Sequence, residues 1–141
     1  MTFTSKITFV HVDDCDDDIY LTERSLSHSN VPSRYVAQMK PLRLFETLDE
    51  LVDADIGIDE IILLLDINMP LCDGFEMLRK IRAHEQYSGL SVIMLSTSDA
   101  EDDIMEAFSA GCDGYIAKPF STEKLVAAVA QIPYSGIRLA H

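Results

Sequence analysis

Four short apolar runs of the sequence are each followed directly by polar residues that could do chemistry. The runs are ITFVHV, IILLL, SVIML and GYIA, and the residues after them are Asp13 and Asp14, Asp66, Ser96 and Thr97, and Lys118. Carboxylate oxygens without a suitably placed His or Cys select a hard cation, and Mg²⁺ fits best. An aspartate can also attack a phosphoryl group to form an aspartyl phosphate. These residue types therefore predict a Mg²⁺-dependent site for phosphoryl transfer.

The charges of these residues explain why such a site needs a cation. Two carboxylates about 4 Å apart repel by roughly 4 kcal/mol at an effective dielectric constant of about 20, so three in one crevice oppose folding. Lys118 offsets one negative charge, and a divalent ion offsets most of the rest. During phosphoryl transfer the metal ion and Lys118 would share the charge of the phosphoryl oxygens, and Ser96 could donate a hydrogen bond to a third oxygen.

The elements that carry these residues alternate regularly along the chain. Strands are expected at 7–12, 35–38, 61–65, 91–95 and 114–117, and helices at about 16–29, 44–52, 74–84, 104–111 and 125–132. Five strand–helix units predict an α/β fold with a doubly wound five-stranded parallel sheet and helices on both faces. Right-handed crossovers leave few topologies, and among these we expect the flavodoxin-like strand order 2-1-3-4-5.

The predicted sheet would bring the polar residues together. The carboxyl ends of parallel strands share one edge, and ligands bind there at the switch point between strands 1 and 3. Taken singly, each residue has a simpler interpretation, because Asp13 and Asp14 could form a solvated turn and Lys118 could be an ordinary loop lysine. Asp16 is expected to cap the first helix. The convergence of all the polar residues on one edge favours a functional site.

Composition narrows the class of protein. The 141 residues fit one domain, which we expect over 1–141, with a core at about 5–132 and a tail at 133–141 too short for an output domain. The net charge of −13 argues against binding nucleic acid or an anionic membrane. No apolar run reaches the length of a membrane span, and Met1–Lys6 lacks a signal-peptide pattern, so we expect a cytoplasmic protein.

The cysteines and histidines suggest no further site at this stage. The three cysteines show no C-x-x-C spacing and are expected to be small apolar fillers rather than zinc ligands or disulfide partners: Cys15, Cys72 and Cys112. His11 falls in the middle of a strand and is expected to be a buried or edge side chain. None of the four histidines has a partner pattern that indicates metal ligation.

Four blocks of the sequence resemble the receiver domain of two-component response regulators, the CheY-like family. The blocks are VDD at 12–14, DINMPLCDG at 66–74, MLST at 94–97 and GCDGYIAKPF at 111–120. The second and fourth blocks are specific, whereas the acidic pair alone is not. The resemblance extends from the first strand to the last helix, and it implies a single-domain regulator that switches when it is phosphorylated.

The resemblance also implies a role for each residue. Asp66 would accept a phosphoryl group from a phosphohistidine of a sensor histidine kinase or a histidine phosphotransfer protein. The other roles would be Mg²⁺ ligation by Asp14, Asp66 and the backbone carbonyl of Asn68, water-mediated Mg²⁺ contact by Asp13, charge pairing by Lys118, and switching by Ser96 and Tyr115. A one-residue shift of the alignment would give the role of Ser96 to Thr97. The Lys118–Pro119 peptide bond would be cis.

Two other functions remain open. Asp14-Cys15-Asp16 superficially matches the Asp-x-Asp pair of haloacid-dehalogenase-type phosphohydrolases, although that fold needs a longer chain, a cap and a later acidic pair. The chain could also be a degenerate receiver that only binds partners, but the full acidic set and Lys118 argue against this. If it is a switch, the resemblance implies an unidentified downstream protein target, docking on the face formed by the fourth helix, the fifth strand and the fifth helix, and a possible homodimer.

Overall fold

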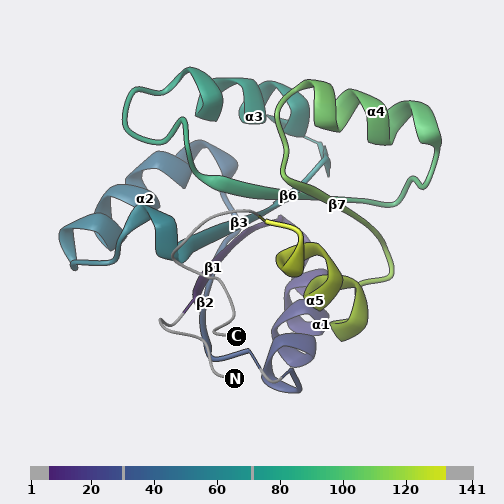
Figure 1. Ribbon diagram of the computed structural model, residues 1–141, viewed down its shortest axis with the longest axis horizontal. Helices are drawn as coiled ribbons and strands as arrows, with labels where there is room; N and C mark the ends of the chain where they lie inside the picture. The colour runs from purple at the N-terminus through teal and green to yellow at the C-terminus, as the bar shows by residue number, and fades with distance from the viewer. Residues whose placement is uncertain (1–6, 30, 71, 133–141) are drawn as a thin grey trace.

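The computed structural model describes residues 7–132, apart from residues 30 and 71, and shows a parallel sheet between two layers of helices (Figure 1). The strands of this sheet are β1 Ile7–Val12, β2 Ser33–Gln38, β3 Ile61–Asp66, β6 Ser91–Ser96 and β7 Gly114–Ala117. They lie in the order β2-β1-β3-β6-β7, all parallel. Numbered by their place in the chain, this is the predicted order 2-1-3-4-5, so the fold class is confirmed. The expected tail at 133–141 and the segment Met1–Lys6 lie outside the described residues.

The helices cover both faces of the sheet. They are α1 Asp16–Ser27, α2 Leu44–Asp53, α3 Gly74–Ala83, α4 Glu101–Ser109 and α5 Thr122–Ala130, with short 3₁₀ turns at Pro41–Arg43 and Ile58–Glu60. Helices α1 and α5 lie together on one face, and α2, α3 and α4 lie on the other (Figure 1). Within the described residues, none of these helices combines the length and the apolar character needed to traverse a bilayer.

Strand β3 shows how the sequence produces two hydrophobic cores. Its five apolar residues are fully buried, and successive side chains point to opposite faces. Ile61, Leu63 and Leu65 pack in the core beneath α2, α3 and α4, whereas Ile62 and Leu64 pack in the core beneath α1 and α5. A continuous apolar run is needed here because both faces of a central parallel strand are covered. The polar side chain of Asp66 therefore emerges only where the strand ends.

Two local features differ from the sequence-based predictions. A two-stranded antiparallel hairpin, β4 Asn68–Met69 with β5 Cys72–Asp73, follows β3 and orders the loop after Asp66. The prediction that Asp16 caps the first helix is wrong by one residue, because the N-cap position falls on Cys15 and Asp16 is the first helical residue. The acidic residues that open α1 still interact favourably with the positive end of the helix dipole.

Gly74 allows α3 to begin against the end of β3. A Cβ atom at this position would lie 2.7 Å from the Cα of Ile67 and 3.0 Å from the backbone oxygen of Asp66. Backbone atoms cannot move aside as a flexible side chain can, so any larger residue would displace the turn that follows Asp66. Asp73 starts the helix by accepting a hydrogen bond from the N–H of Phe75 at 2.9 Å.

The guanidinium of Arg82, near the end of α3, contacts the segments at the amino-terminal ends of two neighbouring strands, β6 and β7. Its Nε donates to the carbonyl of Gly111 at 2.8 Å, its Nη1 donates to the carbonyl of Leu90, and its Nη2 pairs with Asp113 at 3.0 Å. Gly111 ends the α4 region with a φ of +107°, a conformation that favours glycine. One side chain therefore links the segments that lead into β6 and β7.

Candidate functional site

The three predicted carboxylates meet at the carboxyl edge of the sheet. Asp13 and Asp14 follow β1 and Asp66 ends β3, and carboxylate oxygens of all three lie within 4.8 Å of one another. Asp13 is 0% exposed and Asp66 is 2% exposed, whereas Asp14 is exposed to solvent. The cluster therefore combines two buried carboxylates with one that faces water.

Lys118 reaches this cluster from the segment after β7. Its Nζ lies 3.5 Å from Oδ1 of Asp66 and 3.6 Å from Oδ2 of Asp13. Its backbone N–H donates to the carbonyl of Ser96 at 2.7 Å, and the Lys118–Pro119 bond is cis, as the resemblance implied. The sequence thus correctly predicted that this lysine would meet the acidic residues.

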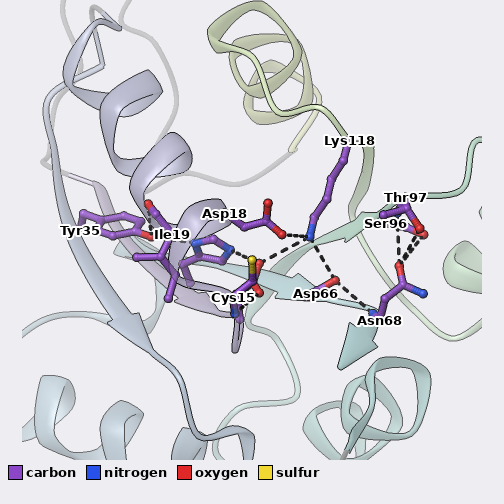
Figure 2. A network of polar contacts seen from close by, with 11 residues as sticks. Cys15, Asp18, Ile19, Tyr35, Asp66, Asn68, Ser96, Thr97 and Lys118 are labelled. Atoms are coloured by element: carbon purple, nitrogen blue, oxygen red, sulfur yellow. Dashed lines mark hydrogen bonds and ion pairs between the residues drawn. The ribbon is translucent and has the colours of Figure 1, made fainter. Parts of the chain in front are cut away.

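Asp18 is a site residue that the sequence-based reasoning missed. Its Oδ2 lies 2.6 Å from Nζ of Lys118, closer than either of the other carboxylates (Figure 2). Burial acts to lower the pKa of Lys118, but the hydrogen bond to Asp18 and the charges of Asp66 and Asp13 outweigh it and raise that pKa. The available signal was the position of Asp18 in the first turn of a helix that begins at the edge of the site.

Asn68 joins the segments that follow β3 and β6. Its backbone N–H donates to Oδ1 of Asp66 at 3.0 Å, while its side-chain oxygen accepts from Oγ of Ser96 at 3.3 Å and from the N–H of Thr97 at 3.2 Å (Figure 2). The resemblance assigned only the backbone carbonyl of Asn68 to the site. The structure adds a side chain that bridges the expected phosphoacceptor strand and the expected switch hydroxyl.

The two candidate switch hydroxyls differ in their surroundings. Ser96 is 2% exposed, and its Oγ accepts a hydrogen bond from the N–H of Ser98 at 3.0 Å, whereas Thr97 is exposed. The hydroxyl of the half-buried Tyr115 donates to the carbonyl of Ser98 at 2.8 Å. Ser98 therefore connects the buried hydroxyl to the aromatic residue that the resemblance paired with it.

His11 also contacts the acidic cluster, which the sequence-based reasoning did not foresee. Its ring is fully buried, with Nε2 at 3.2 Å from Oδ2 of Asp13 and Nδ1 at 2.7 Å from the hydroxyl of Tyr35. That hydroxyl also lies 3.3 Å from the carbonyl oxygen of Ile19 in α1 (Figure 2). The available signal was strand alternation, because His11 and Asp13 are two residues apart and so point to the same face.

The two buried carboxyl groups differ in pKa. Burial acts to raise the pKa of Asp13, but the contact with His11 and the hydrogen bond from the backbone N–H of Cys15 lower it below the usual value. The pKa of Asp66 is raised by burial and by the charge of Asp13, against the opposing effect of the N–H of Asn68. The expected phosphoacceptor is therefore the carboxylate whose charge is opposed most by its surroundings.

These residues fit a divalent cation. The available donors are carboxylate oxygens, which hard ions such as Mg²⁺ prefer. Within the described residues, Oδ2 of Asp13 is buried and makes no hydrogen bond of good geometry, although nitrogen atoms of His11 and Lys118 lie 3.2 and 3.6 Å from it. Buried carboxylate oxygens normally have partners, and a cation would supply one.

Comparisons with known proteins agree with this geometry. The family model of the response regulator receiver domain matches residues 38–130. A chemotaxis protein CheY homolog of Campylobacter jejuni is 31% identical over 87 residues, which cover 55% of this chain and 67% of that protein. The matched segments span between 32% and 67% of the length of the curated relatives compared.

Solved structures share the same architecture. The bacteriophytochrome response regulator RtBRR superposes with a TM-score of 0.79 at 24% identity, covering 97% of this chain and 84% of that one. The phosphorylated cyanobacterial phytochrome response regulator RcpA has a TM-score of 0.68 at 28% identity, with coverages of 87% and 88%. With the sheet order and the family match in agreement, the chain belongs to the response regulator receiver domain family of two-component systems.

Proposed function

We propose that the protein is a phosphorylation-driven switch in which Asp66 accepts the phosphoryl group. The observation that carries this proposal is the convergence of the carboxylates of Asp13, Asp14 and Asp66 within 4.8 Å, with Nζ of Lys118 3.5 Å from Asp66. The donor is a phosphohistidine of a sensor histidine kinase or a histidine phosphotransfer protein. Membership of the receiver family and the likeness to a phosphorylated relative support this assignment.

The proposed reaction transfers one phosphoryl group between two proteins. A carboxylate oxygen of Asp66 forms a bond to phosphorus while the bond from phosphorus to the donor's imidazole nitrogen breaks, and the imidazole leaves with the bonding electron pair. Asp14, Asp66 and the backbone carbonyl of Asn68 would hold Mg²⁺, and Asp13 would contact it through water. When bound, Mg²⁺ supplies positive charge against the carboxylates and the phosphoryl oxygens.

Lys118 and Ser96 act on the phosphoryl group once it is attached. The ammonium of Lys118 pairs with a phosphoryl oxygen, and the hydroxyl of Ser96 donates a hydrogen bond to another. Movement of Ser96 would break the hydrogen bond that its Oγ accepts from Ser98, whose carbonyl holds the hydroxyl of Tyr115. The rearrangement would thereby reach the face formed by α4, β7 and α5, which we propose as the docking surface for a downstream protein or for a second copy of the chain.

The test is direct phosphorylation by a small-molecule donor. Full-length protein incubated with Mg²⁺ and phosphoramidate is expected to gain one phosphoryl group, measured by mass spectrometry. Asp66→Asn should abolish the gain, and Asp102→Asn, which removes an exposed carboxylate on α4, should leave it unchanged. Absence of any label on the wild-type protein would favour the degenerate receiver instead.

The phosphohydrolase alternative has less support. Asp16 is exposed in the first turn of α1, and the acidic cluster found among the described residues comprises Asp13, Asp14 and Asp66 instead. Asp16 is therefore not a member of the cluster that contains Asp14. Label retained in Asp66→Asn but lost in Asp14→Asn would nevertheless restore the hydrolase interpretation.

A further inference from the structure

The mechanism above gives no role to the imidazole of His11, a fully buried polar group. It belongs to β1, and its neighbours in the sheet register are Ala37 on β2 and Leu64 on β3. The side chain lies on the same face as Phe9, in the core beneath α1 and α5, where an apolar residue would be expected. Burying an imidazole there is unfavourable unless its nitrogen atoms find partners.

Both ring nitrogen atoms face a specific polar group. Nδ1 lies 2.7 Å from the hydroxyl of Tyr35, and Nε2 lies 3.2 Å from Oδ2 of Asp13. Burial, together with the charges of Glu23 and Asp13, raises the pKa of Tyr35 above its usual value, so the phenol keeps its proton. We assign the hydroxyl hydrogen to Nδ1, because that contact is shorter than the 3.3 Å contact with the carbonyl of Ile19. With Nδ1 accepting from Tyr35, a ring hydrogen lies on Nε2, facing Asp13.

We propose that His11, held by Tyr35, is a positioning residue that orients the Asp13 carboxylate for Mg²⁺ binding. This inference rests on the proposed function, since it concerns the same metal site. The opposite oxygen of Asp13, Oδ1, accepts the N–H of Cys15 at 3.0 Å. Each oxygen of the carboxylate therefore has a neighbouring nitrogen, and we infer that these two contacts restrict its orientation before a cation binds.

The effect of such orientation on metal affinity can be measured. Groups that contact a metal ligand from behind set its rotamer and its charge distribution, and their loss typically weakens metal binding by about 10–100-fold. Asp13 is fully buried, but in the proposed site it contacts the ion through water rather than directly, so the effect of losing His11 is expected near the lower, about tenfold, end of this range. Tyr35 belongs to the edge strand β2, so its hydroxyl links His11 to that strand.

The test is calorimetric titration of the unphosphorylated protein with Mg²⁺ alone. It compares the affinity of the wild type with that of three test variants and one control variant. His11→Leu should bind Mg²⁺ about tenfold more weakly, and Tyr35→Phe should weaken binding less, because the ring remains but its Nε2–H tautomer is no longer selected. His11→Gln places an amide N–H near the position of Nε2 and should recover part of the loss. Tyr20→Phe removes an exposed hydroxyl from α1 and serves as the matched control.

The folded state of each variant separates positioning from a structural role. Removing His11 leaves the Tyr35 hydroxyl and Oδ2 of Asp13 without a neighbouring polar group, so His11→Leu should unfold at a lower denaturant midpoint. Its Mg²⁺ affinity is therefore compared without denaturant, where circular dichroism must show a folded protein. If His11→Leu does not fold, Tyr35→Phe carries the same comparison. Nitrogen NMR should independently show a hydrogen on Nε2 of His11 in the wild type, and a hydrogen on Nδ1 alone would overturn the proposal.

The outcomes also separate this inference from the proposed function. If the wild type binds Mg²⁺ and Asp14→Asn does not, but His11→Leu and Tyr35→Phe both bind within twofold of the wild type, the positioning role is wrong and the switch survives. If the wild type neither binds Mg²⁺ nor becomes phosphorylated, both proposals are wrong. A loss of Mg²⁺ affinity in folded His11→Leu that His11→Gln partly restores supports the positioning role.

Discussion

The ammonium of Lys118 lies 2.6 Å from Oδ2 of Asp18, which is the shortest carboxylate contact of this lysine within the described residues. Asp18 belongs to the first turn of α1, outside the cluster of Asp13, Asp14 and Asp66. Lys118 therefore divides its charge between the site and a neighbouring helix. In the proposed mechanism the same ammonium must pair with the phosphoryl group, so Asp18 competes with the reaction.

Removing this competitor should speed phosphorylation. In Asp18→Asn the carboxamide holds Lys118 less tightly, so the ammonium is freer to pair with the incoming phosphoryl group. We expect the rate with phosphoramidate and Mg²⁺ to rise by a few-fold, since about 1.4 kcal/mol corresponds to tenfold and the Asp18 side chain, 32% exposed, is partly screened by water. Asp17→Asn, an exposed change on the same turn, is the control. A slower rate would mean that Asp18 positions Lys118 instead.

Magnesium should stabilise the folded protein against denaturation. A ligand that binds only the native state adds about 2.7 kcal/mol at a concentration 100 times its dissociation constant. We therefore expect Mg²⁺ to raise the urea midpoint of the wild type, and expect Asp14→Asn to remove most of this increase. Asp14 is the exposed member of the cluster, so the substitution should leave the metal-free midpoint nearly unchanged. An equal Mg²⁺ effect in both proteins would exclude Asp14 as a ligand.

Asp66→Asn should stabilise the metal-free protein at neutral pH. Because the pKa of Asp66 is raised in the folded state, its ionised form opposes folding above that pKa, and the penalty disappears below the pKa of the unfolded chain. A neutral amide removes the penalty, so the free energy of unfolding at pH 7 should rise. Urea unfolding of both proteins between pH 7 and pH 4 should show the difference shrinking toward acid. A difference that grows toward acid would contradict the assigned direction.

Ser96 and Thr97 should differ in their effect on phosphorylation. Ser96 is buried beside Asn68, whereas Thr97 is exposed, so we expect Ser96 to be the hydroxyl that binds the phosphoryl group. A hydrogen bond to a charged group contributes about 1.5–3 kcal/mol, so Ser96→Ala should slow phosphorylation by about tenfold or more. Thr97→Ala should change the rate less than twofold. The reverse result would transfer the role to Thr97.

Gly74→Ala should damage both the fold and the site. The added methyl group would lie 2.7 Å from the Cα of Ile67 and 3.0 Å from the oxygen of Asp66, and overpacking of this kind costs about 1–3 kcal/mol. We expect a lower urea midpoint and slower phosphorylation, because the turn that carries Asp66 must shift. Gly89→Ala is the matched control, since its Cβ would meet nothing within 4 Å.

The alternation of strand-like and helix-like segments along the chain, together with the polar residues that end the apolar runs, predicted the sheet and the residues at its edge. Asp13 follows β1, Asp66 ends β3 and Lys118 follows β7, and the strand order then brings them together. The positions of these residues depend on backbone topology, and the sequence pattern shows where each strand ends. The hairpin after Asp66 was not predicted, because strands of two residues are too short to show a period.

The contacts of Asp18 and His11 were missed for a different reason. Each depends on the direction of a side chain, and the residue types alone allowed simpler interpretations. An aspartate in the first turn of a helix is normally explained by the helix dipole, and a histidine within a strand is normally a core or edge residue. Only coordinates show that Asp18 reaches Lys118 and that His11 lies behind Asp13.

The guanidinium of Arg82 would keep the sheet intact while the proposed switch changes conformation. Its bonds to Gly111, Leu90 and Asp113 anchor the amino-terminal ends of β6 and β7, the same two strands whose far ends carry Ser96 and Lys118. Rearrangements at the carboxyl ends of β6 and β7 are therefore expected to leave the amino-terminal ends of these strands in place and the rest of the sheet intact.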